Sequence, residues 1–221
     1  MAHKLFIAGL IIFCLVSCKS ESEWEEFDDP IFITYLHEHY NIPITENGHI
    51  DLNDEPTLRA LGEIKSLNLD EVQCISLTGI NNLVSLTRLS CNDNRLTSLD
   101  VSYLRNLRQL DCSNNYLKTI NASGCANLGI LCCSNNQIQN LKLRECTDMI
   151  HIDCRNNRIK ELDIRDCDKL NILYFDPQTD NENNIQELTI LMPLELKKRW
   201  EEEGWGKQNP NVIAVFSNKN I

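Results

Sequence analysis

Positive charge is scarce in this sequence of 221 residues, a length that fits one or two domains. It holds 21 Lys and Arg against 32 Asp and Glu, a formal net charge of −11. Nucleic-acid affinity depends largely on cationic contacts to phosphates, so no nucleic-acid partner is predicted. Gly and Pro are also few, 8 and 6, whereas 42% of the residues are hydrophobic. This composition predicts a folded chain with a buried core.

Motifs of common enzyme classes are missing as well. The sequence contains no Gly-rich phosphate loop, no H-E-x-x-H and no G-x-S-x-G. We therefore predict a non-catalytic protein that uses no cofactor and no metal ion.

The N-terminus carries the long apolar run of the sequence. His3 and Lys4 precede residues 5–16, which are apolar apart from Gly9. Twelve residues are fewer than the roughly 20 that a membrane-spanning helix needs, so we predict a signal peptide over 1–17. The segment Leu15-Val16-Ser17-Cys18 resembles the lipobox of bacterial lipoproteins. That resemblance implies cleavage before Cys18 and its acylation; the alternative is an ordinary secretory signal.

Residues 18–30 are rich in Glu and Asp and lack apolar periodicity before Ile31. They predict a solvated tether behind the lipidated cysteine. Acidic residues at this place also resemble the export signal of lipoproteins in Gram-negative anaerobes of the Bacteroidetes type. The resemblance implies an outer membrane lipoprotein on the cell surface, and a periplasm-facing location stays open.

A regular repeat dominates the rest of the chain. Its first apolar column holds Leu86, Leu107, Leu128, Met149 and Leu170. Each row then reads L-x-x-L-x-C-x-x-N-x-L, with Cys91, Cys112, Cys133 and Cys154 in one column and Asn94, Asn115, Asn136 and Asn157 in another. This pattern resembles the leucine-rich repeat, with Cys where Leu is commoner. The more degenerate row that contains residues 75–83 resembles repeats of the bacterial internalin type.

The resemblance implies an α/β solenoid, mostly β, whose rows of about 21–22 residues form a parallel sheet over 64–190. A second alternation follows each turn, such as Leu99 with Val101, and predicts extended return segments. We expect helical caps at 31–63 and 191–221. The second cap should contain a helix that starts at Pro193 and ends near Gly204, with Trp200 and Trp205 over the last row.

The cysteine columns predict packing rather than chemistry. Cys91, Cys112, Cys133 and Cys154 form one column, and Cys125, Cys146 and Cys167 form another. In-register rows hold Cβ atoms near 4.8 Å, which is wider than a disulfide prefers, so we predict free buried thiols. Cys132 falls on the outward side near His151, but a lone Cys and His do not make a nucleophile. The Asn column is predicted to bond the turns of the rows.

The N-terminal cap should contain two helices, over 31–40 and 56–65, around a turn at Gly48. Helix, Gly-turn and helix look like a decayed calcium-binding hand. With Gly48 at loop position six, Pro43 and Thr45 occupy positions that need charged oxygen donors, and Asp54 stands at position twelve. Poor calcium affinity is therefore expected at 43–54.

The outward face of the sheet is the candidate binding site. Its mixed apolar and charged residues suit a protein epitope. The predicted partner-binding residues are Arg88, Asn92, Gln109, Asp111, Ile130, Cys132, His151, Asp153, Arg155, Ile172 and Tyr174. The predicted partners are an unidentified protein and, through the N-terminal lipid, a membrane. A glycan-binding accessory role in nutrient uptake is the alternative, although Tyr174 is the one clear aromatic platform on this face.

Overall fold

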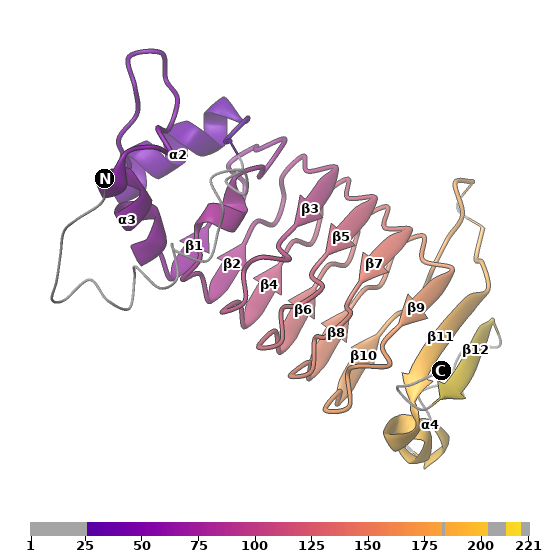
Figure 1. The fold of residues 1–221 in the computed structure, drawn as a ribbon. Helices are drawn as coiled ribbons and strands as arrows, with labels where there is room; N and C mark the ends of the chain where they lie inside the picture. Colours follow the sequence, from indigo (N-terminus) through magenta and orange to yellow (C-terminus); the bar gives the residue numbers. More distant parts are fainter. Residues whose placement is uncertain (1–25, 183, 203–210, 218–221) are drawn as a thin grey trace, which may run out of the picture.

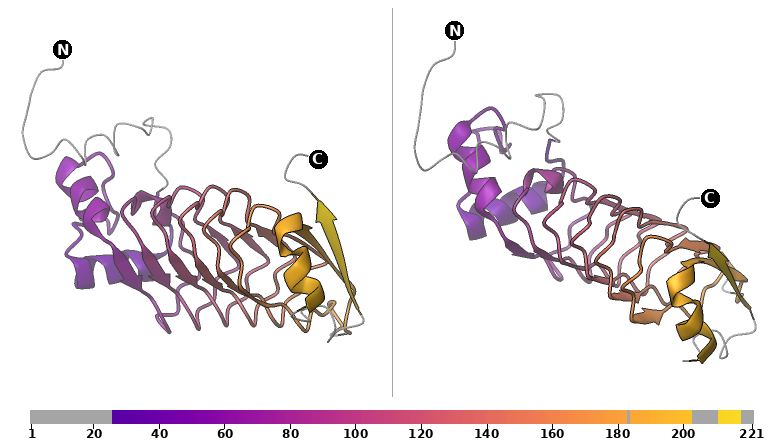
Figure 2. Two further views of the ribbon diagram at one scale, coloured as in Figure 1. Left: turned by 90° about the horizontal axis from the view of Figure 1, so that it is seen from below. Right: turned by 60° about the horizontal axis from the view of Figure 1, so that its bottom comes forward.

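The chain forms an elongated solenoid in a computed structural model that describes residues 26–182, 184–202 and 211–217 (Figure 1). The predicted signal peptide, Cys18 and Trp205 lie outside these residues. Helices stand at the two ends of the solenoid, and its rows run between them (Figure 2). None of the helices within the described ranges has the length and apolarity needed to cross a membrane.

One side of the solenoid is a six-stranded parallel sheet, called the front sheet here, in the order β1-β2-β4-β6-β8-β10. Its strands are β1 (Ser66–Asn68), β2 (Arg88–Ser90), β4 (Gln109–Asp111), β6 (Ile130–Cys132), β8 (His151–Asp153) and β10 (Ile172–Tyr174). Leu67 pairs with Leu89 and Leu89 with Leu110, and the same register continues through every later pair. The predicted repeat length and parallel pairing are confirmed.

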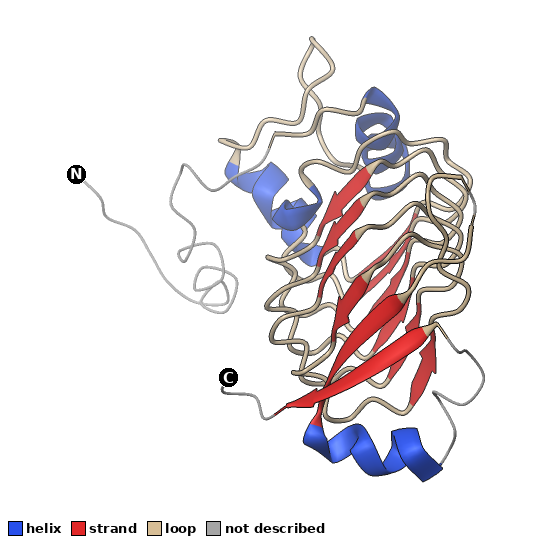
Figure 3. Ribbon diagram, turned by 90° about the vertical axis from the view of Figure 1, so that its right-hand side faces the viewer, coloured by secondary structure: helices blue, strands red, loops and turns tan. Residues whose placement is uncertain are grey.

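The return segments form the opposite side, called the back side here, and they make two sheets (Figure 3). The first contains β3 (Ser98–Asp100), β5 (Thr119–Asn121) and β7 (Asn140–Lys142). The second contains β9 (Glu161–Asp163), β11 (Leu188–Pro193) and β12 (Val212–Ser217). The predicted extended returns are therefore confirmed, whereas the separation between β7 and β9 and the existence of β12 were not predicted.

Leucine and cysteine columns fill the space between the front sheet and the back side. Leu110, Leu131 and Ile152 point inward from the front sheet and have no exposed surface. Ile120 and Leu162 point inward from the back side and are equally buried. Because rows lie about 4.8 Å apart, each inward side chain packs on its counterpart in the next row, which requires the same residue type row after row.

The cysteines serve as packing side chains, as predicted. All nine cysteines of the described ranges are free thiols, and eight of them are buried. Cys125 and Cys146 donate Sγ–H bonds of 3.2 Å to the carbonyls of Val101 and Ala122 in the preceding rows. Burial raises the pKa of both thiols to about 12, so they stay protonated at neutral pH.

The asparagine column ties each row to its neighbours. Asn115 Nδ2 donates to the carbonyls of Cys91, Cys112 and Ser113 at 2.9–3.2 Å, and its Oδ1 accepts from Leu96 N–H at 3.0 Å. The same pattern recurs at the other asparagines of the column. Backbone groups that leave the strand at the buried turn thereby keep hydrogen-bond partners.

Gln178 continues this column in the last row, within the polar segment 176–184. Its side chain is 2% exposed. Nε2 donates to the carbonyls of Cys154 and Phe175, and Oε1 accepts from Ile159 N–H at 2.9 Å. The sequence pattern missed it because Gln replaces Asn and Phe175 replaces Cys. The longer side chain supplies the same amide.

The N-terminal cap contains α2 (Pro30–Tyr40) and α3 (Glu55–Glu63). Tyr35 and Tyr40 donate their hydroxyls to the carbonyls of Asn68 and Ser66, at 2.6 and 3.0 Å. These carbonyls belong to β1, the outermost strand of the front sheet, so the two tyrosines satisfy acceptors that the edge would otherwise leave unpaired. A short 3-10 turn, η2 (Ile80–Asn82), follows β1 within the first row.

Asp29 connects this cap to the first row, so the tether ends earlier than predicted. Asp29 is 2% exposed; its Oδ1 caps α2 at the N–H groups of Ile31 and Phe32. Its Oδ2 accepts from the N–H groups of Ile75 and Ser76, at 2.6 and 3.0 Å. Phe27 is also buried, with its ring 5.5 Å from that of Phe32. The prediction of a solvated tether up to residue 30 is therefore wrong from Phe27 onward.

The segment that looks like a calcium hand is built as a helix connection. Asp54 Oδ2 accepts from Thr57 N–H at 3.0 Å and from the Thr57 hydroxyl at 2.7 Å, which makes it the N-cap of α3. Asp51 Oδ1 accepts from Asn53 N–H. Both carboxylates are thus engaged in local backbone contacts.

The C-terminal end differs from the prediction. Pro193 is the last residue of β11 and not the start of a helix; η3 (Leu194–Leu196) and α4 (Lys197–Glu202) follow it. Trp200 lies between Phe175 and Phe216, with ring centroids 6.3 and 6.5 Å away. Trp200 therefore covers the last row, as expected, and Phe216 of β12 contacts it. The sequence did not predict β12, because an apolar alternation over six residues is too short to be distinctive.

Replacement of Asn115 tests the amide column. Asn115→Ala removes four hydrogen bonds of a buried amide and should lower the free energy of unfolding by about 3 kcal/mol or more. Asn127→Ala removes one exposed bond to the carbonyl of Arg105 and should cost about 1 kcal/mol or less. Urea denaturation followed by circular dichroism gives both values, and equal losses would contradict the structural role of the column.

The link between cap and first row is tested at Asp29. Asp29→Ala leaves four backbone N–H groups without their acceptor and should destabilise the cap by about 2 kcal/mol or more. The neighbouring Asp28→Ala, at an exposed position, is the matched control and should change little. Hydrogen exchange at Ile75 and Ser76 should accelerate in the first variant alone; unchanged exchange there would show that the cap is held by other contacts.

Candidate functional site

The predicted partner-binding residues lie on the solvent side of the front sheet, called the front face here. Arg88, Gln109 and Tyr174 are exposed, and Ile130, Cys132, His151 and Ile172 are half-buried. In register, Ile130 lies beside His151, which lies beside Ile172. Cys132, Asp153 and Tyr174 form the parallel column. The period of two in each strand therefore brings these side chains together as predicted.

The front face has a polar half toward the N-terminus. Asp70 Oδ1 accepts from the Ser90 hydroxyl at 2.7 Å and from Asn92 N–H at 2.8 Å. Asn92 Oδ1 accepts from Ser113 N–H, and Asp111 Oδ1 accepts from the Ser113 hydroxyl. Asp70 was not among the predicted site residues. Its place in the column of Asn92, one row earlier, was the signal that could have found it.

The opposite half is apolar and aromatic, and a fixed arginine lies at its centre. Arg155 Nε and Nη2 donate to the two carboxylate oxygens of Asp153 at 2.9 and 2.6 Å. The guanidinium carbon is 4.8 Å from the ring centroid of Tyr174. His151 meets the same ring edge-on, with centroids 5.7 Å apart. A bidentate pair and two ring contacts hold these four side chains in one arrangement.

Asp153 is less accessible than predicted. It is 9% exposed, because Arg155 folds over it, so it positions Arg155 rather than meeting a partner itself. Burial alone would raise the pKa of its carboxyl, but the hydrogen bonds and charge of Arg155 outweigh burial and hold that pKa below the ordinary value. Tyr174 remains 47% exposed beside this pair.

Cys132 is not a poised nucleophile. Burial, followed by the charges of Asp111 and Asp153, raises the pKa of its thiol to about 11, and Arg155 offsets only part of this. A thiol with such a pKa is almost fully protonated at neutral pH. The Nε2 atom of His151 is buried and has no hydrogen-bond partner among the described residues, Cys132 included. The prediction that these two residues do not form a catalytic pair is consistent with this geometry.

A comparison with protein families agrees with the fold. A family model described as leucine-rich repeats (two copies) matches residues 84–125. With its regular rows and an in-register parallel front sheet, the solenoid has the leucine-rich repeat fold. No curated protein matches the chain.

A solved structure, described as the functional domain of InlJ from Listeria monocytogenes that includes a cysteine ladder, is 22% identical to the chain. The match covers 62% of this chain and 45% of that one, with a TM-score of 0.40. The chain thus spans less than half the length of that domain.

The Asp153–Arg155 pair gives stability a pH dependence. The folded-state pKa of Asp153 lies below its unfolded value, so its contribution is present above about pH 4 and lost as pH falls through the folded pKa. Arg155→Ala should therefore cost about 1–2 kcal/mol at pH 7, a discounted value because Arg155 is half exposed, and less at pH 3. Arg144→Ala, at a side chain that is 82% exposed, is the control. Equal losses at both pH values would contradict the assigned pair.

Proposed function

We propose that this protein binds another protein through the front face, as a non-catalytic interaction or adhesion module. The observation that carries the proposal is the cluster of Asp153, Arg155, His151 and Tyr174 on an open sheet. Tyrosine and arginine dominate the energetics of many protein interfaces. Here their side chains are already ordered by one another, so little conformational entropy is lost when a partner binds.

The layout of the front face supports a protein partner. Ile130, Cys132 and Ile172 provide a half-buried apolar centre next to Tyr174, and the hydrogen-bonded half around Asp70 provides a polar rim. An apolar centre beside a polar rim is the usual anatomy of a protein interface. The strands are in register and lie side by side in neighbouring rows, so these groups form a continuous surface (Figure 1).

The proposal includes attachment to a membrane through acylated Cys18. Its support is the lipobox-like segment Leu15-Val16-Ser17-Cys18 and the acidic residues that follow it. Two or more acyl chains would anchor the protein stably, whereas one chain gives marginal binding. Such an anchor would place the solenoid at the bacterial outer membrane, with the front face available to soluble or surface-bound partners.

The front face is tested by replacing its exposed aromatic side chain. Tyr174→Ala should weaken binding of the captured protein partner by about 2 kcal/mol, roughly thirtyfold, without unfolding the chain. Tyr103→Ala is a matched control, since Tyr103 is 48% exposed against 47% for Tyr174 but lies outside the front sheet. Affinity capture followed by surface plasmon resonance measures both effects.

Equal affinity of the two variants would exclude the front face as the binding surface. A parallel glycan array distinguishes the alternative class. Retention of a glycan that depends on Tyr174, with no protein captured, would favour the accessory role in nutrient uptake instead.

A further inference from the structure

The C-terminal end of the solenoid presents a strand edge. Among the described strands, β12 pairs with β11 alone and is the outer strand of the sheet β12-β11-β9 (Figure 1). It has 6 residues, whereas β2 of the front sheet has 3. Its sequence, VIAVFS, contains no charged residue and no Pro, the residue types that commonly keep a strand edge from pairing. β12 therefore has the length and composition of a strand that accepts a neighbour.

The outer edge of β12 carries the backbone groups of every second residue. Leu188 N–H donates to the carbonyl of Asn211 at 2.9 Å, and Leu188 is in register with Val212. In a parallel ladder, this phase directs the N–H and C=O groups of Val212, Ala214 and Phe216 away from β11. No backbone or side-chain group of the described residues bonds to them. A further strand would find unpaired donors and acceptors there.

Apolar side chains flank this edge on both sides of the sheet. Ile213 and Val215 point outward and are 47% and 42% exposed. The side chains of Val212, Ala214 and Phe216 point toward the core but are only half-buried, although their partners on β11 are buried. A neighbouring strand would remove apolar surface from water on both sides of the sheet.

The strand is complementary to an antiparallel copy of itself. In either direction from Ala214, a β-branched residue comes first, Ile213 or Val215, and an apolar residue comes next, Val212 or Phe216. With Ala214 opposite its own copy, Ile213 therefore lies against Val215, and Val212 lies against Phe216. Aromatic–β-branched pairs across strands are favourable. In this register the residues with unpaired backbone groups form the hydrogen-bonded pairs, so the groups of both edges find partners.

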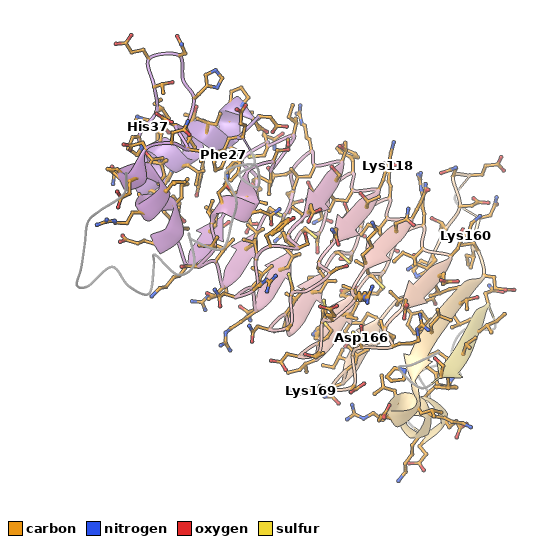
Figure 4. The ribbon with its side chains drawn as sticks, viewed as in Figure 1. Phe27, His37, Lys118, Lys160, Asp166 and Lys169 are labelled. Carbon is orange, nitrogen blue, oxygen red and sulfur yellow. The ribbon has the colours of Figure 1, made fainter. Side chains whose placement is uncertain are left out.

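Charge repulsion between two copies is small at this end. Residues 188–221 hold 5 Lys and Arg and 4 Glu, a formal charge of +1. The remaining 16 Lys and Arg and 28 Asp and Glu carry −12. Charged side chains such as Lys118, Asp166 and Lys169 lie along the rows before β12 (Figure 4). The acidic character of the chain thus lies outside its C-terminal end, where like charges would otherwise oppose self-association.

The opposite end of the solenoid does not offer a matching edge. Tyr35 and Tyr40 donate to carbonyls of β1, the first strand of the front sheet. On the back side, Asn81 Nδ2 donates to the carbonyl of Asp100 in β3 at 3.1 Å. Head-to-tail growth would need an open edge at this end. Pairing of β12 with β12 uses one end of each copy, and the assembly closes as a two-fold dimer.

We propose that β12 is a dimer interface, at which a second copy of this chain binds antiparallel about a two-fold axis at Ala214. The two sheets β9-β11-β12 join into one continuous sheet across the axis. The contact does not use the front face, so it stands or fails independently of the proposed function. Because the axis is perpendicular to the joined sheet, both front faces point to the same side. If the proposed function holds, the dimer binds a surface-attached partner bivalently.

Sedimentation of the purified full chain tests the association. The chain should form a dimer at micromolar concentration, and A214P should lower the dimer affinity at least about tenfold. Pro at this position removes an N–H that points away from β11, so the bonds between β11 and β12 remain. Tyr103→Ala, at an exposed residue outside β12, is the control and should leave the affinity unchanged.

Two results of this measurement would overturn the proposal. A chain that stays monomeric up to about 100 µM would exclude a second copy as the occupant of the edge. Equal association of A214P and the unchanged chain would place the contact elsewhere in the molecule.

Disulfide trapping tests the register. In the proposed pairing, the two Ala214 Cα atoms are about 5.5 Å apart, within the range of about 4.4–6.8 Å found for disulfides. I213C is the matched control, because the register places the two Ile213 Cα atoms about 8 Å apart, too far for a disulfide. Mild oxidation should give a covalent dimer of A214C and at least about tenfold less of I213C. Mass spectrometry of the linked peptides distinguishes this bond from one at the half-buried Cys132.

The trapping experiment has two contrary outcomes. Preferential linkage of I213C would show a different register, and linkage of neither variant would show that the two strands do not pair. Either result overturns the proposal. Neither bears on partner binding at the front face, which Tyr174→Ala tests separately.

Discussion

Every row of this solenoid must repeat the hydrogen bonds and contacts of the row before it. The front sheet keeps one register through all of its strands, and the buried amides of Asn94, Asn115, Asn136, Asn157 and Gln178 bond each row to the preceding one. A row that departs from the register would leave buried N–H and C=O groups without partners, at a cost of about 1–3 kcal/mol each. That constraint explains why the repeat length of the sequence hardly varies from row to row. It also explains the cysteine column, where a small apolar side chain packs on the same residue type in the next row.

A solenoid built this way has strand edges at both ends, and the two ends of this chain differ there. Tyr35 and Tyr40 give hydroxyl donors to the carbonyls of β1, and Asp29 fixes the cap through four backbone N–H groups. The C-terminal end adds a pair of long strands instead, with Trp200 packed between Phe175 and Phe216. The N-terminal cap thereby reduces the exposure of the outer edge of β1, whereas β12 becomes the outer strand of its sheet at the C-terminal end.

The sequence predicted the periodic parts of the structure well, because periodicity reports directly on which side chains point inward. The strands of the front sheet follow from the resemblance to leucine-rich repeats, and the free thiols and the outward residues from Arg88 to Tyr174 follow from the spacing of the columns. What it missed depends on single, non-repeating contacts. Gln178 replaces Asn by a longer amide, Asp29 bonds to a segment far along the chain, and Asp153 is covered by its neighbour Arg155. The residue pattern within one row does not predict a contact with a segment far away in the sequence.

The interruption of the back side illustrates the same limit. Up to β7, the front and back sides of the rows advance along the sequence by the same step. From β9 to β11 the step is longer, with Leu162 beside Ile190, while Ile152 beside Leu173 keeps the regular step in front. β9 pairs with β11 in a sheet that also contains β12, and among the described strands β7 therefore has a back-side partner on one side only, which is β5. The rows on either side of the break are held together by β6 and β8 and by the amide of Asn157. The front face therefore stays continuous at the place where the back side opens, because its register does not depend on the back side.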